Sequence, residues 1–135
     1  MRGFSDTKML NSNELELMGK AARYISIIPS SIGFRCREVS RAIGYLLNLQ
    51  VQDGHYGLVE HSWLWLQPWT WGTHPPSILD PYVIEYVPKV RIVEFNPSIR
   101  DLYNPRKDPY VINQNMVNTL IREMQKIDSK QGELK

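Results

Sequence analysis

Three side chains in this chain have the chemistry of a nucleophilic triad, namely Cys36, His61 and Asp80. A cysteine nucleophile needs an imidazole that accepts and returns its proton, and a third group that holds the imidazole in one tautomer. Cys36 is the only cysteine in the 135 residues, and Asp80 closes a short apolar run directly before Pro81. These residue types in this order predict nucleophilic thiol chemistry if the fold brings them together.

Cys36 is expected at the start of a helix, where backbone N–H groups and the helix dipole favour an anion and make a thiol more acidic. Arg35 and Arg37 flank it, and Arg41 follows about one turn later. All three add positive potential if they point towards the thiol. The alternative is that Cys36 is a small buried apolar side chain, as most isolated cysteines are.

His61 begins an aromatic stretch in which Trp63 and Trp65 share its face of the predicted strand. A strand holds a general base in a fixed position, but a histidine packed among tryptophans would fit the same pattern. The two tryptophans either wall a cleft or belong to the core. Asp80 either orients His61 or opens an Asp-Pro turn. The spacing of the histidines and the cysteine does not match a zinc site, so we expect no metal.

Two helices precede these strands. Asn13 as N-cap, with Glu16 three residues later, predicts a helix over 14–27, and Pro29 ends it. A second amphipathic helix is expected over about 36–48.

The pattern then changes from helical spacing to alternation. Asp53-Gly54 predicts a hairpin turn, followed by a central strand over about 56–66 that is apolar on both faces. Residues after 96 read as irregular up to a last helix over about 113–127. Further strands are expected at 77–80, 82–87 and 89–95. This order predicts an α+β fold, with N-terminal helices packed on a small antiparallel sheet and a C-terminal helix.

The length fits one domain over 1–135, with an N-terminal arm at 1–10, a core at 11–127 and a frayed tail at 128–135. A formal charge of +2 argues against nucleic acid or an anionic membrane as partner. No apolar run reaches the roughly 18 residues of a membrane span, and the first residues lack the apolar core of a signal peptide. A single free thiol favours a cytoplasmic location.

The motifs resemble the transglutaminase-like branch of the papain-like cysteine enzymes. In that family the cysteine starts a helix packed on an antiparallel sheet, the histidine opens a strand as His-(small)-Trp, and the aspartate follows on the next strand. The matching features are Cys36, His61-Ser62-Trp63 and Leu79-Asp80-Pro81, and the resemblance covers about residues 30–95. The interval from Cys36 to His61 is compact for the family, and Phe34 is the nearest aromatic residue where a tryptophan often precedes the cysteine.

The resemblance implies a papain-like core and acyl transfer on an amide of a protein or peptide, by hydrolysis, deamidation or transamidation, with no cofactor. Cys36 would attack the carbonyl, His61 would carry the proton, and Asp80 would orient His61. The Cys36 backbone N–H would be one oxyanion donor. Arg35, Trp63 and Trp65 would lie around the substrate.

The alternative function is a non-catalytic protein-binding or assembly module on a similar scaffold. The aromatic and proline-rich segments at 67–76 and 97–110 would suit protein contacts.

Overall fold

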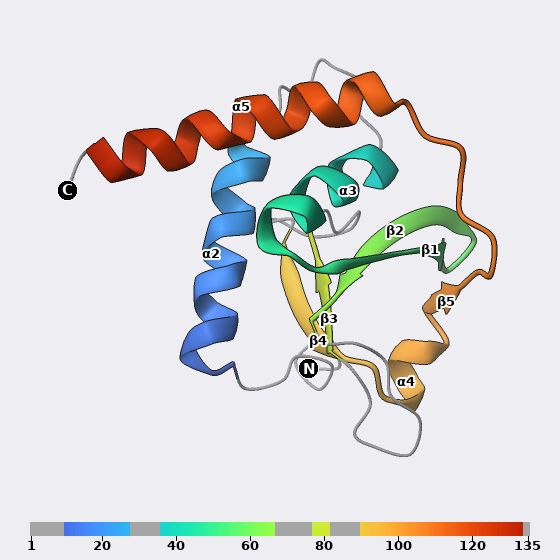
Figure 1. The fold of residues 1–135 in the computed structure, drawn as a ribbon. Coiled ribbons are helices and arrows are strands. Elements are labelled where there is room, and N and C mark those ends of the chain that lie inside the picture. Colours follow the sequence, from blue (N-terminus) through green and yellow to red (C-terminus); the bar gives the residue numbers. More distant parts are fainter. Residues whose placement is uncertain (1–9, 28–35, 67–76, 82–89, 134–135) are drawn as a thin grey trace.

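The computed structural model describes residues 10–27, 36–66, 77–81 and 90–133, with only the backbone for Cys36 and residues 130–133. Within these ranges the chain forms four helices and one curled sheet of five strands (Figure 1). The predicted α+β class, with helices packed on an antiparallel sheet, is confirmed. Among the described helices, none is both long and apolar enough to cross a bilayer.

The sheet has the order β4-β3-β2-β1-β5, and each neighbouring pair is antiparallel. The strands are β1 (Gln50–Tyr56), β2 (Val59–Trp65), β3 (Ser77–Asp80), β4 (Arg91–Glu94) and β5 (Tyr103–Pro105). β3 and β5 are separated by two strands, yet the Tyr103 hydroxyl lies 2.5 Å from Asp80 Oδ2. The sheet therefore curls far enough for the Tyr103 side chain of its outer strand β5 to reach Asp80 of β3.

Two hydrophobic cores lie on opposite faces of the sheet. The helix-side core joins one face of the sheet, including Leu64 of β2, to α2 (Ser12–Ser26), α3 (Cys36–Leu47) and α5 (Gln114–Glu133). Figure 1 shows these three helices on one side of the sheet. The aromatic core fills the other face and adjoins the short helix α4 (Pro97–Arg100). Its buried residues are Tyr56, Trp63, Trp65, Ile78, Val93, Phe95, Ile99 and Tyr103. Because β2 contributes to both cores, the prediction that it is a central strand covered on both faces is confirmed.

α2 begins two residues earlier than predicted. The N-cap is Asn11 and not Asn13, because Glu14 N–H donates to Asn11 Oδ1 at 2.8 Å and Asn11 N–H donates to Glu14 Oε1 at 3.1 Å. The sequence contains two overlapping capping boxes, and the structure uses the first.

α3 ends close to the predicted position at a left-handed residue. Asn48 takes a φ of 59°, and the Leu49 N–H donates to the Gly44 carbonyl at 2.8 Å. This is the backbone pattern of a Schellman motif, in which asparagine can replace the usual glycine. The chain thereby reverses directly from α3 into β1.

The hairpin turn predicted at Asp53-Gly54 is wrong, since both residues lie inside β1. The chain turns instead at Gly57-Leu58, between the paired residues Tyr56 and Val59, and Gly57 takes a φ of 63°. Gly57 is needed for its positive φ, whereas Gly54 is needed because a neighbouring strand lies too close for a side chain. A Cβ there would collide with the backbone carbonyl of Asn104 as β5 packs alongside.

We expect Gly54→Ala to lower the free energy of unfolding by about 2 kcal/mol, because the added methyl forces β5 away from β1. Gly19→Ala is the matched control. Gly19 lies inside α2, where the nearest atom to an added Cβ is 3.8 Å away, so this change should be neutral or stabilising by about 0.5–1 kcal/mol. Urea unfolding of both variants measures the difference. Equal stabilities would contradict the close approach of β5.

The C-terminal third is more ordered than the sequence predicts. α4 and β5 occupy the segment expected to be irregular, and α5 continues to Glu133 through residues expected to fray. The Tyr24 hydroxyl donates to Asp128 at 2.7 Å, so α2 holds this end of α5. β3 has the predicted bounds, β4 is shorter than predicted, and the strand expected at 82–87 lies outside the described residues.

Candidate active site

His61 and Asp80 meet as predicted. The ring Nε2 of His61 lies 3.0 Å from Oδ1 and 2.9 Å from Oδ2 of Asp80, and the two residues are 1% and 0% exposed. An ionised carboxylate only accepts hydrogen bonds, so Nε2 carries the proton that points at Asp80. In the neutral ring the lone pair then belongs to Nδ1, which is the nitrogen able to take a proton from a nucleophile.

Asp80 is itself bound by a tyrosine, and an arginine donates to that tyrosine. The Tyr103 hydroxyl donates to Asp80 Oδ2 at 2.5 Å. Arg91 Nη2 donates to the Tyr103 oxygen at 3.2 Å and to the Tyr56 oxygen at 3.4 Å. Burial and the negative charge of Asp80 raise the pKa of Tyr103 well above its ordinary value. The hydroxyl therefore keeps its proton and remains a donor to Asp80.

The edge of β2 beside His61 is where β3 stops. Leu66 N–H donates to the Ser77 carbonyl at 2.9 Å, and such pairs recur every second residue of an antiparallel ladder. Continuing this register brings Ser62 opposite Pro81, which has no N–H to give. The Ser40 hydroxyl of α3 donates to the Ser62 carbonyl instead, at 3.1 Å. The beginning of α3 thus satisfies the β2 carbonyl that lies beyond the end of β3.

Arg37, near the start of α3, contacts the residue on the other side of His61 in the sequence. Its guanidinium lies 2.9 Å from Glu60 Oε1, donates to the Val111 carbonyl at 3.1 Å and sits 4.6 Å above the Tyr110 ring. In the sequence, Glu60 directly precedes His61, and Ser62, whose carbonyl accepts from Ser40, directly follows it. α3 is therefore anchored to β2 on both sides of His61.

Cys36 begins α3, one turn before Ser40, so its backbone lies at the helix end that is anchored around His61. The Cys36 side chain and Arg35 lie outside what the structure describes. The His61 ring faces the aromatic core, whereas α3 packs on the opposite face of the sheet. A contact between Cys36 and His61 would therefore pass around the edge of β2 next to Pro81.

Trp63 and Trp65 are buried, with 0% and 3% of their surfaces exposed. The Trp65 indole N–H donates to Gln52 Oε1 at 3.1 Å, and the two indoles pack edge to face. This burial favours the core interpretation over the cleft wall. The tryptophans at 69 and 71 lie outside the described residues.

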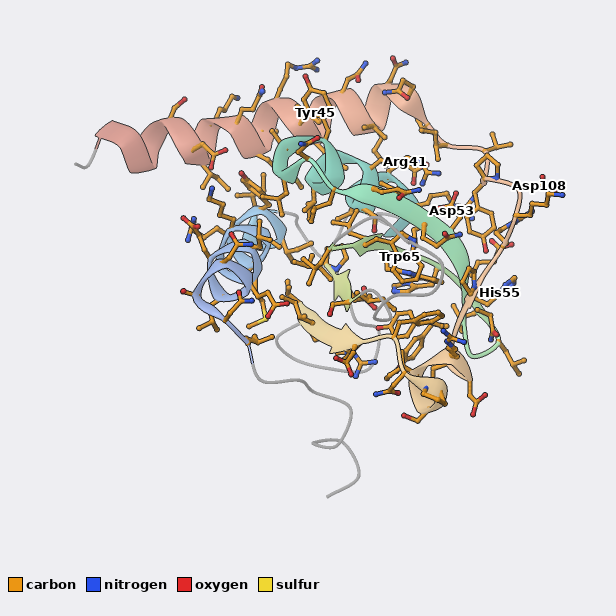
Figure 2. The ribbon with its side chains drawn as sticks, turned by 60° about the horizontal axis from the view of Figure 1, so that its bottom comes forward. Arg41, Tyr45, Asp53, His55, Trp65 and Asp108 are labelled. Atoms are coloured by element: carbon orange, nitrogen blue, oxygen red, sulfur yellow. The ribbon has the colours of Figure 1, made fainter. Side chains whose placement is uncertain are left out.

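A second buried network, around Asp53, was not predicted. Arg41 Nη1 and Nη2 donate to its carboxylate at 3.1 and 2.6 Å, Ser62 Oγ at 2.6 Å and Tyr110 N–H at 2.9 Å. Burial alone would raise the pKa of Asp53, but these hydrogen bonds and the Arg41 charge hold it below its ordinary value. Arg41 on α3 points at Asp53 on β1 (Figure 2), so its charge is paired there.

Among the described residues, no group of three or more acidic, histidine or cysteine side chains is arranged to hold a metal ion. No protein-family model, curated protein or solved structure matches this chain with significance.

Proposed function

We propose that this chain is a cysteine-dependent acyl-transfer enzyme that acts on an amide of a protein or peptide. The observation that carries the proposal is the anchoring of the α3 N-terminus at Glu60 and Ser62, the two neighbours of His61, while Asp80 binds the His61 ring. Thiol nucleophiles require a helix N-terminus, a histidine and a carboxylate that orients the histidine. Here the start of α3 is anchored next to His61 in β2, and Asp80 orients the His61 ring on the opposite face of the sheet.

In the proposed reaction the Cys36 thiolate attacks the amide carbonyl and forms a carbon–sulfur bond. The Cys36 backbone N–H stabilises the negative oxygen. His61 gives its proton to the leaving amine as the carbon–nitrogen bond breaks, which leaves a thioester. Water or a second amine then attacks the thioester, loses its proton to His61 and releases the thiolate. Asp80 keeps the other ring proton on Nε2 throughout.

This proposal includes a papain-like core and a cytoplasmic location, where a lone thiol stays reduced. Hydrolysis, deamidation and transamidation share the first half of the reaction and differ only in the attacking group.

A second candidate is a non-catalytic protein-binding module. Two observations favour it: the His61 side chain is fully buried, and large apolar side chains are exposed near β2. These are Leu58 and Val59 at the hairpin and Val111, whose carbonyl binds Arg37 on α3. Exposed apolar groups of this kind are suited to protein contacts.

Alkylation of Cys36 by iodoacetamide separates the two candidates. An activated thiolate should react at pH 6 about tenfold faster than glutathione, after allowance for the weaker nucleophilicity of low-pKa thiolates. Cys36→Ser supplies the background, because Cys36 is the only thiol. A rate equal to or below that of glutathione would contradict the enzyme and favour the binding module.

A further inference from the structure

We propose that Tyr103, held by Arg91, is a positioning residue that fixes Asp80 and limits how strongly Asp80 stabilises the protonated form of His61. The inference rests on the proposed function of the His61–Asp80 pair. It adds two residues, from β5 and β4, to a site that the family resemblance confines to α3, β2 and β3.

The geometry carries this role. Asp80 Oδ2 accepts from both Tyr103 and His61, at 2.5 and 2.9 Å, so one oxygen is shared between the two donors. Arg91 lies directly across from Asp80 in the β3–β4 register, and its Nε and Nη2 both donate to the Tyr103 oxygen, at 3.4 and 3.2 Å. Since a donor that also accepts a hydrogen bond from a cation is polarised, Arg91 strengthens the Tyr103 bond to Asp80.

The chemical consequence concerns the charge on Asp80. A carboxylate stabilises an adjacent imidazolium, and a strong donor on the same oxygen draws part of that charge away. Among the described residues, the titratable groups that face His61 are Asp80 from β3, Tyr103 from β5 and Tyr56 from β1, and Arg91 of β4 acts through the two hydroxyls. Within this set Tyr103 is the donor that contacts Asp80. Removing its hydroxyl should leave Asp80 more basic and His61 easier to protonate.

Tyr103→Phe in the full chain tests this with a readout that does not depend on activity. The pKa of His61 is followed through its ring ¹⁵N and ¹H signals, which His61→Gln assigns. We expect an upward shift of about 0.5 to 1 unit. Tyr56→Phe is the matched control, since it removes a hydroxyl from the same arginine without touching Asp80, and it should shift the His61 pKa much less.

Equal His61 pKa values in the wild type, Tyr103→Phe and Tyr56→Phe would overturn the inference. If Tyr103→Phe does not fold, Arg91→Gln is the second variant, because loss of the polarising charge should shift the same pKa upward; no shift would again overturn it. Cys36 alkylation across pH separates the two proposals. A shifted His61 pKa with an unchanged Cys36 profile supports the role of Tyr103 and contradicts the pairing of Cys36 with His61.

Discussion

Replacing His61 by glutamine is expected to slow Cys36 alkylation at pH 6 about tenfold and to move the midpoint of its pH profile towards that of a free thiol, about 8.5. Glutamine is close to histidine in size and can still bond to Asp80, but it cannot form the cation that stabilises a thiolate. Asp80→Asn should have a smaller effect, because His61 remains and a cysteine enzyme tolerates asparagine as its third member. The measurement is the pseudo-first-order rate of Cys36 alkylation, taken at about ten pH values between roughly pH 4 and 10.

His55→Gln is the control for this experiment. His55 lies in β1 opposite Glu60 and is only partly buried, so the substitution should leave the Cys36 profile unchanged. Far-UV circular dichroism verifies that each variant is folded. If His61→Gln leaves the pH profile where it is in the wild type, His61 is not the partner of Cys36 and the triad is wrong.

The second large effect concerns stability. Asp53→Asn should lower the free energy of unfolding by about 3 kcal/mol, because it leaves the Arg41 guanidinium partly buried without its counter-charge. Asp53 has a lowered pKa in the folded chain, so its contribution is present above the unfolded pKa of about 3.9 and is lost as pH falls through the folded value. Wild-type stability should therefore drop on acidification below about pH 4, and the variant should lack that part of the drop.

Urea unfolding of the wild type and of Asp53→Asn, at steps of about one pH unit from roughly pH 2 to 7, tests both expectations. Glu123→Gln is the matched control. Its carboxylate pairs with Lys126 at 2.9 Å, but both side chains are at least half exposed, so the loss should stay below about 1 kcal/mol. A similar loss in the two variants would show that the Asp53 network contributes no more than a surface ion pair.

Much of the site could be predicted from local pattern. The alternation through His61 and Trp63 assigned them to one face of β2, and the apolar run before Pro81 gave β3 its observed bounds. Strands that follow each other in the chain commonly pair, so the contact between His61 and Asp80 could be predicted. These features depend on neighbours in the sequence or on adjacent strands.

Local pattern failed where two candidate positions lay close together. Asp53-Gly54 is the stronger hairpin sequence, yet the chain turns at Gly57-Leu58, and Asn11 and Asn13 both suit a helix N-cap. For the hairpin, contacts from elsewhere hold Asp53 inside β1, since Arg41 and the Tyr110 N–H both donate to its carboxylate.

The sequence by itself determined the two N-terminal helices, the bounds of β3, the central position of β2 and the pairing of His61 with Asp80. Only the tertiary structure decided what surrounds that pair. Tyr103 reaches Asp80 because the sheet curls until β5 lies near β3, and Ser40 reaches the Ser62 carbonyl because Pro81 ends the ladder there. Curl results from the packing of both faces at once, so no window of sequence encodes it.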